Sequence, residues 1–259
     1  MKKVGLQLYS IRDAMEKDVP GSLKKVRDMG YEYVEFAGYF GYSAEELRNM
    51  MDELGLKCVS VHQSYQDLLD KPEETIAYLK TLGVKYFVVP YMGKENHKGG
   101  EFFEKTVDNF KNISALLKAS GMKLLYHNHE FEFEKYEDKF LLDWLFETVG
   151  PENLETEIDT CWVKYAGYSP EKYILQHKGC AEILHLKDFV GNTGLEKTRD
   201  ENNFSMKPIG EGCQDWESIL SAAEEAGTEY FIVEQDDYFD TNSLDAVKRS
   251  RDYLKSIGY

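Results

Sequence analysis

The segment MGYEYVEF, residues 29–36, shows the unit from which this chain is built. An amphipathic stretch ends at Gly30, and a short apolar run begins directly after it. Glycine is favoured just past the end of a helix, because that position often needs a positive φ angle that disfavours residues with a Cβ atom. The segment therefore predicts a helix, a turn at Gly30 and a buried strand.

The same pattern recurs along the whole chain. Its other copies are LGLKCVSV (54–61), LGVKYFVV (82–89), SGMKLLYH (120–127), VGPENLETEID (149–159), KGCAEILHL (178–186) and AGTEYFIVE (226–234), with Ile257-Gly258 at the end. Together with the opening strand KVGLQLYS (3–10), this gives eight strands, each followed by a helix. Alternating strands and helices form a parallel sheet with right-handed crossovers, and eight such units close into a (β/α)8 barrel. We expect an α/β fold, a single-domain TIM barrel over residues 1–259.

An open doubly wound sheet is the alternative fold. It would more often show about five or six units and a glycine-rich phosphate loop. The sequence contains neither GxGxxG nor GxxxxGK[ST]. Helix starts are also marked, since Ser43 to Glu46 fits a capping box and Pro72 and Pro170 suit a first helical turn. The polar stretch 188–216 is too long for an ordinary loop, and we expect it to act as a lid before a helix that begins near Asp215.

Composition excludes several classes of protein. The chain has 31 Lys plus Arg against 47 Asp plus Glu, a net charge of −16, which disfavours binding to nucleic acid. No apolar run approaches the ~18 residues of a membrane helix, and the N-terminus lacks the apolar core of a signal peptide. The four cysteines show no CxxC spacing. We expect a cytoplasmic protein with neither nucleic acid nor membrane as partner, and the aromatic content of 14% is compatible with a homo-oligomer.

Ionisable residues gather where the predicted strands end, which is where TIM barrels build their active sites. Side chains alternate faces along a strand, so His127 shares a face with His129, Asp159 with Glu157, and His185 with Lys187. Imidazole and carboxylate groups converging from adjacent strands are typical of a divalent metal site. The pattern predicts the ligand set His127, Asp159, His185 and Glu234.

Two neighbouring features receive separate expectations. Lys187 follows His185 by two residues, so it can reach the same volume as a cation, or it is a solvated lysine at the strand end. The run Asp236, Asp237 and Asp240 is interpreted as a solvated loop face that supplies no further ligands.

These residues resemble a known family along essentially the whole chain. The phrases that carry the resemblance, in this order, are GLQLYSIRD, GYEYVEFAG, YHNHEFEF, EIDTCWVKYAG, ILHLKDF, PIGEGCQDW and YFIVEQD. The chain is similar to sugar phosphate isomerases/epimerases of the xylose isomerase-like TIM-barrel superfamily. The resemblance implies one divalent metal ion (Mn, Zn, Co or Mg) and a carbohydrate substrate.

The fifth strand departs from the family pattern. In ketose 3-epimerases similar to this chain the ligands are Glu, Asp, His and Glu, which implies Asp159, His185 and Glu234 here, with His127 where the first glutamate would stand. Such epimerases use two opposed glutamates to move a proton from one face of the sugar carbon to the other. With His127 in place that pair is incomplete, and the resemblance offers Glu132 as a second glutamate after the same strand.

The shared chemical step of such enzymes gives the remaining assignments. A divalent ion bound to two vicinal oxygens stabilises the charge that develops when a carbon next to a carbonyl loses its proton. The resemblance implies Glu234 as the base, Glu132 or His62 as its counterpart, and Lys187 as electrostatic support. The substrate-binding positions implied by the resemblance are Gln7, Tyr9, Arg12, Glu35, His129 and Trp162.

The leading expectation is a metal-dependent isomerase or epimerase acting on a sugar or sugar derivative. The alternative enzyme is a metal-dependent lyase or dehydratase that acts on a keto-sugar, a 3-keto-glycoside or an inositol-like ring. A nuclease of the abasic-site type is disfavoured by the net charge, and a non-catalytic sugar-binding protein is the remaining class. The sequence offers no phosphate-binding nest, so we expect a neutral or weakly charged carbohydrate.

Overall fold

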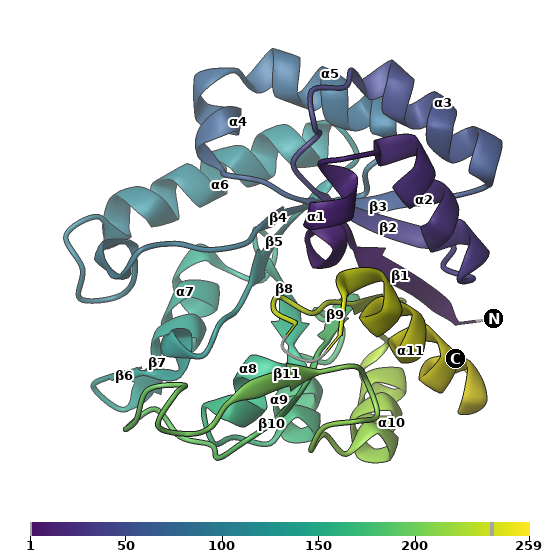
Figure 1. The fold of residues 1–259 in the computed structure, drawn as a ribbon. Helices are drawn as coiled ribbons and strands as arrows, with labels where there is room; N and C mark the ends of the chain where they lie inside the picture. The colour runs from purple at the N-terminus through teal and green to yellow at the C-terminus, as the bar shows by residue number, and fades with distance from the viewer. Residues whose placement is uncertain (1, 239–240) are drawn as a thin grey trace.

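The computed structural model describes residues 2–238 and 241–259, and within them eight parallel strands close into a barrel (Figure 1). The strands are β1 (Lys3–Gln7), β2 (Tyr33–Ala37), β3 (Lys57–His62), β4 (Tyr86–Val89), β5 (Lys123–His127), β8 (Glu155–Asp159), β9 (Ile183–Leu186) and β12 (Tyr230–Val233). Strand β1 pairs in parallel with both β2 and β12, so the first and last strands of the barrel close it. The predicted (β/α)8 barrel is confirmed.

Helices surround the barrel and cover its outer face (Figure 1). They are α1 (Arg12–Met15), α2 (Val19–Asp28), α3 (Ala44–Leu54), α4 (Gln66–Asp70), α5 (Pro72–Leu82), α6 (Phe103–Ala119), α7 (Leu141–Val149), α8 (Thr160–Tyr165), α9 (Pro170–Gln176), α10 (Trp216–Ala226) and α11 (Ser243–Ser256). A short antiparallel pair, β6 (Lys135–Tyr136) and β7 (Lys139–Phe140), precedes α7. The large apolar core lies between these helices and the outward side chains of the strands.

The local signals read from the sequence are present. The glycines that follow the predicted helices have φ angles between 69° and 94°, the left-handed region where glycine carries no Cβ penalty; they are Gly30, Gly55, Gly83, Gly121, Gly150, Gly179, Gly227 and Gly258. Ser43 and Glu46 form the expected capping box, and Pro72 and Pro170 stand in the first turns of α5 and α9.

The inside of the barrel is layered, as the inward residues of β5 show. Lys123 lies at the amino end of that strand, Leu125 at mid-height and His127 at the carboxyl end. Leu125 belongs to a small apolar cluster with Val88 and Ile232 that fills the middle of the barrel. A polar layer at the carboxyl end therefore rests on a packed apolar floor.

The stretch after β9 contains secondary structure that the sequence did not predict. Strands β10 (Asp188–Val190) and β11 (Ser205–Lys207) pair antiparallel within the stretch for which we expected a lid. The Asp188 carboxylate fixes the segment between β11 and α10. It accepts hydrogen bonds from the backbone N–H groups of Gly210 and Gly212 and from the indole N–H of Trp216. A Cβ at position 212 would lie 2.0 Å from Asp188 Oδ1, so this close approach requires glycine. Helix α10 begins at Trp216 with Asp215 as its cap, as expected.

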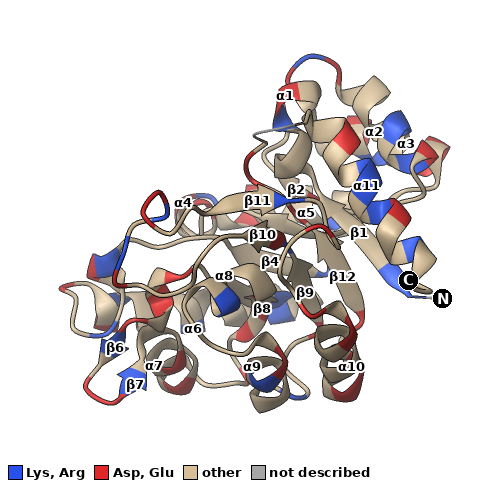
Figure 2. Cartoon of the chain, turned by 60° about the horizontal axis from the view of Figure 1, so that its bottom comes forward, with Lys and Arg blue, Asp and Glu red and all other residues tan. Residues whose placement is uncertain are grey.

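The charge distribution, the helix hydropathy and the cysteines complete the description. Figure 2 shows Lys and Arg interspersed with Asp and Glu over the helices, without a basic stripe in that view. Among the described residues no helix is both long and apolar enough to cross a membrane. The cysteines Cys58, Cys161, Cys180 and Cys213 are free thiols.

An ion-pair layer closes the amino end of the barrel and gives a prediction about acid stability. Burial opposes the charge of Glu182, but hydrogen bonds from Lys123 and Tyr86 outweigh it and hold the pKa of this carboxyl at about 2. Because the pKa of Glu182 is lowered on folding, its ionised form stabilises the protein above about pH 4.5, and this contribution is lost as pH falls towards about 2. Urea unfolding should find Glu182→Gln less stable than the wild type at neutral pH, with the two converging near pH 2. A stability difference that stays constant with pH would contradict this.

Candidate metal centre and active-site cavity

A cavity of about 500 Å³ opens at the carboxyl end of the barrel. It is lined by Tyr9, Ala37, His62, Pro90, Tyr91, His127, His129, Trp162, Lys187, Arg199, Glu234 and Asp236. This is the end at which TIM barrels carry their active sites, and the lining mixes aromatic rings with convergent charged groups.

Four side chains at and beneath the floor of this cavity form what we call the outer group: His127 and Glu234, which line it, and Asp159 and His185, which are fully buried behind them. One nitrogen or oxygen of each lies within 4.8 Å of the corresponding atoms of the others, and all four residues are buried. His127 Nε2 is 3.3 Å from Asp159 Oδ2 and 3.8 Å from Glu234 Oε2, and His185 Nδ1 is 2.8 Å from the same Glu234 oxygen. The structure thus brings together the four residues predicted as metal ligands.

The outer group fits a divalent ion by spacing and by chemistry. Ligand atoms about 2.1 Å from one tetrahedral ion lie about 3.4 Å from each other, which is close to most of these separations. Two imidazoles and two carboxylates are donors that suit zinc, manganese or cobalt. Two carboxylates buried at one point also need positive charge beside them.

Lys187 supplies part of that charge. Its ammonium Nζ lies 3.0 Å from Asp159 Oδ2, 2.9 Å from Glu234 Oε2 and 3.0 Å from Asp236 Oδ2, and the side chain is buried. Lys187 is therefore a buried cation of the site, not a solvated lysine. Asp236 also lines the cavity, so the expectation that it belongs to a solvated loop face was wrong; Asp237 is exposed, and Asp240 lies outside the described residues.

These contacts shift the ionisation of the site. Burial opposes the charge of Asp159, but Lys187 and His127 outweigh it and hold its pKa at about 2. Burial also opposes the charge of Glu234, while Lys187 and His185 lower its pKa well below the usual range. Both carboxylates are thus ionised at neutral pH, the state in which they bind metal ions.

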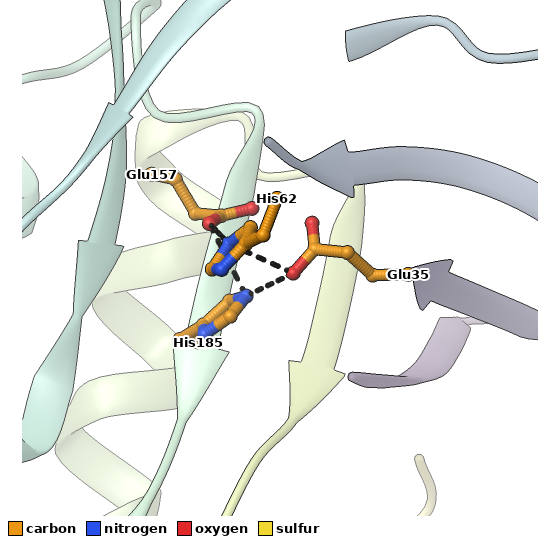
Figure 3. Close-up of side chains that lie close together, drawn as sticks. All are labelled: Glu35, His62, Glu157 and His185. Atoms are coloured by element: carbon orange, nitrogen blue, oxygen red, sulfur yellow. Dashed lines mark hydrogen bonds and ion pairs between the residues drawn. The ribbon is translucent and has the colours of Figure 1, made fainter. Parts of the chain in front are cut away.

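A second cluster shares His185 with the outer group. It consists of Glu35, His62, Glu157 and His185, and we call it the inner group (Figure 3). His62 Nε2 is 2.6 Å from Glu157 Oε2 and 3.0 Å from Glu35 Oε1. His185 Nε2 is 2.8 Å from Glu35 Oε1 and 3.2 Å from Glu157 Oε2. Each contact joins a ring nitrogen to a carboxylate oxygen at hydrogen-bond distance.

The six residues predicted to bind substrate fall into three positions relative to the cavity. Tyr9, His129 and Trp162 line the cavity, as does His62. Gln7 and Glu35 are fully buried and joined by a hydrogen bond of 2.7 Å, so they lie behind the lining. Arg12 stacks on Tyr9, with its guanidinium carbon 4.1 Å from the ring centroid, and donates to the backbone oxygen of Asp236.

Glu132 does not line the cavity, contrary to the role expected for it. Its carboxylate is fully buried and accepts the hydroxyl of Tyr126 at 2.6 Å and the backbone N–H of His129 at 2.8 Å. Burial raises the pKa of Glu132 to about 8 against the effect of these hydrogen bonds. The chain turns into the short 3-10 helix Phe131–Phe133 after β5, and this turn points Glu132 behind the strand.

Three features of the site were missed from the sequence. Tyr91 lies two residues after the end of β4 and is 59% exposed at the cavity, so its signal was a large aromatic side chain just past a strand end. Arg199 comes from the stretch between β10 and β11, stacks on Trp162 at 4.2 Å and pairs with Glu130. Glu157 was placed on the face of Asp159 by the alternation of the strand but was not singled out.

Comparison with known proteins agrees with this geometry. The family described as xylose isomerase-like TIM barrel matches residues 23–257, and the chain belongs to this family. The inosose dehydratase of Geobacillus kaustophilus is 25% identical over 229 residues, which cover 77% of this chain and 73% of the relative. A sugar phosphate isomerase/epimerase structure from Parabacteroides distasonis has a TM-score of 0.82 at 24% identity, with 98% of both chains covered. The structure of the IolI protein with a bound zinc atom has a TM-score of 0.76 at 18% identity, covering 98% of this chain and 97% of that one.

The outer group makes a prediction about metal affinity that separates ligation from folding. Asp159 also caps α8, since its Oδ1 accepts the backbone N–H groups of Cys161 and Trp162. Asp159→Asn keeps an oxygen for this cap and removes the charge. We expect affinity for Zn²⁺ or Mn²⁺, measured by chelator competition, to fall by more than about 100-fold, because even loss of a partner behind a ligand costs 10–100-fold. Glu182→Gln, at the other end of the barrel, is the control. Unchanged affinity in both Asp159→Asn and His127→Gln would refute the ligand assignment.

Proposed function

We propose that this protein is a metal-dependent lyase that acts on a carbohydrate or cyclic polyol bearing a carbonyl group. The reaction removes a proton from the carbon next to the carbonyl and expels the oxygen substituent of the following carbon, which forms a carbon–carbon double bond. The observation that carries the proposal is the outer group, two members of which line the cavity, with a histidine, His127, at its β5 corner.

The outer group would hold one divalent ion through His127, Asp159, His185 and Glu234. When bound, such an ion polarises the substrate carbonyl and stabilises the negative charge of the deprotonated carbon. The IolI protein, which has a similar barrel and a bound zinc atom in its structure, supports a metal ion in this fold.

We assign the removal of the proton to Glu234. The hydrogen bond and ion pairs of its carboxylate are made by Oε2, towards His185 and Lys187, and Oε1 has no hydrogen bond to the described residues. The residue lines the cavity, so Oε1 is the free oxygen on that side. The ionised state of Glu234 and the fixed position of its other oxygen suit a general base.

We assign to His62 the protonation of the departing oxygen. Its Nε2 contacts the carboxylates of Glu35 and Glu157. The His62 ring lines the cavity, and its Nδ1 has no hydrogen bond to the described residues. Burial opposes the charge of the His62 ring, but Glu35 and Glu157 outweigh it and raise its pKa to about 10, so Nδ1 also carries a proton at neutral pH. Passed to the departing oxygen, this proton lets it leave as water or an alcohol. Lys187 lies between the carboxylates of Asp159 and Glu234 and adds positive charge where the substrate charge develops.

Elimination is preferred over epimerisation for two reasons. Inversion needs a second group that returns the proton to the opposite face, and the expected second ligand carboxylate is replaced by His127. Elimination needs one base and one acid. The curated relatives from Geobacillus kaustophilus and Clostridium beijerinckii are both named inosose dehydratase, which supports the lyase. The isomerase or epimerase remains the second candidate, because Glu234 and His62 come from different walls of the barrel, as inversion would also require.

The test is incubation of the metal-loaded protein with 2-keto-myo-inositol and with 3-keto-glucosides in heavy water. We expect loss of water or of the glycosidic alcohol, seen by mass spectrometry, and a double bond in the product seen by NMR. Glu234→Gln should lower the rate by about 10²–10⁴-fold, the usual contribution of a general base, whereas Glu182→Gln should leave it unchanged. A product that has lost neither water nor alcohol, and in which one ring carbon is inverted and carries deuterium, would establish the epimerase instead.

A further inference from the structure

The inner group raises the question of what two buried carboxylates do directly behind a metal-binding histidine. Glu35 and Glu157 have no exposed surface, and they reach the centre of the barrel from β2 and β8 (Figure 3). Burial of such groups is costly unless they are paired and hydrogen-bonded. Neither carboxylate lines the cavity, so neither is placed to touch a substrate.

The hydrogen-bond inventory fixes which ring nitrogens carry hydrogen. An ionised carboxylate accepts hydrogen bonds and donates none. Glu35 Oε1 faces His185 Nε2 at 2.8 Å and His62 Nε2 at 3.0 Å, and it also accepts the side-chain amide of Gln7 at 2.7 Å. Glu157 Oε2 faces the same two ring nitrogens. Both rings must therefore present Nε2–H to the inner group.

The other nitrogen of each ring then faces outward. His185 Nδ1 belongs to the outer group, 2.8 Å from Glu234 Oε2, so without a metal this nitrogen also donates to a carboxylate, and binding of a metal releases that hydrogen. The two rings are stacked, with centroids 5.0 Å apart and planes inclined by 8°, so one pair of carboxylates orients both. The ring of His62 lines the cavity.

We propose that Glu35 and Glu157 are positioning residues that commit the Nε2 hydrogen of both His185 and His62, so that Nδ1 of His185 is presented to the metal ligands and Nδ1 of His62 to the cavity. Gln7 holds Glu35 in place for this purpose. The inference concerns the same site as the proposed function and rests on the ligand set of that proposal, but it does not depend on the reaction catalysed.

The inner group has the composition of a second metal site, and the hydrogen-bond geometry argues against that use. Its four contacts of 2.6–3.2 Å are direct pairs of ring nitrogen and carboxylate oxygen. A neutral imidazole has one nitrogen with a free lone pair. His185 therefore cannot give Nδ1 to an ion in the outer group and Nε2 to an ion in the inner group while it keeps its hydrogen. One ion per chain is expected.

The first test reads the hydrogen positions directly in metal-free protein. Nitrogen-15 NMR of protein labelled at histidine should show hydrogen on Nε2 of His62 and His185, with the signals assigned by the variants His62→Gln and His185→Gln. In Glu35→Gln/Glu157→Gln the Nε2 atoms of the two rings should no longer uniformly carry hydrogen, because an amide can turn either a donor or an acceptor towards Nε2. A wild-type His185 with Nδ1–H and bare Nε2 would overturn the proposal.

The second test is metal affinity, measured with Zn²⁺ alone by chelator competition. The double variant should bind about 10–100-fold more weakly than the wild type, the usual cost of removing partners behind a ligating histidine. Glu182→Gln is again the matched control, and circular dichroism checks that each variant is folded. Unchanged affinity in a folded double variant, or two ions bound per wild-type chain, would contradict the proposal. A protein that passes both tests and still lacks lyase activity would refute the proposed function alone.

Discussion

The central constraint on this molecule is the burial of carboxyl groups at the carboxyl end of a closed barrel. Taking a charge out of water costs several kcal/mol unless a partner of opposite charge and hydrogen bonds replace the solvent. Glu35, Glu157, Asp159 and Glu234 are all buried there. The ammonium of Lys187 forms ion pairs with Asp159 and Glu234. The ring of His62 pairs with Glu157, and the ring of His185 pairs with Glu35. Most other features of the site follow from this pairing.

His185 links the two halves of the arrangement, because its Nε2 faces the inner carboxylates and its Nδ1 faces the ligand group. A single side chain thus connects the packed interior to the cavity. The apolar layer beneath, with Leu125 and Ile232, excludes water from below, and Trp162 closes one side of the cavity above. Charges in such a low-dielectric setting act more strongly on a substrate than they would in water.

The parts of this account that the sequence predicted are those fixed by short-range chemistry. A glycine that needs a positive φ marks a helix end without reference to the rest of the chain, and Gly30 and Gly227 both did so. Closure of eight strands then places their carboxyl ends together, which is why His127, Asp159, His185 and Glu234 were found from strand position alone. Alternation along a strand gave the inward direction of each.

What the sequence did not predict depends on distances across the barrel or on the course of loops. Glu35 and His185 are 150 positions apart, and only the closed barrel shows that they touch. The 3-10 turn after β5 directs Glu132 towards Tyr126, although its position in the chain suggested the cavity. The strands β10 and β11 are each three residues long, too short for a periodic pattern, so the hairpin and the approach of Arg199 to Trp162 had no local signal.

The most direct test of the central claim is a crystal structure grown with Mn²⁺ or Zn²⁺, with anomalous scattering recorded at the absorption edge of the metal. The account predicts one anomalous peak about 2.0–2.2 Å from atoms of His127, Asp159, His185 and Glu234. A peak seated among Glu35, His62 and Glu157, or ligand side chains turned away from a shared centre, would contradict it.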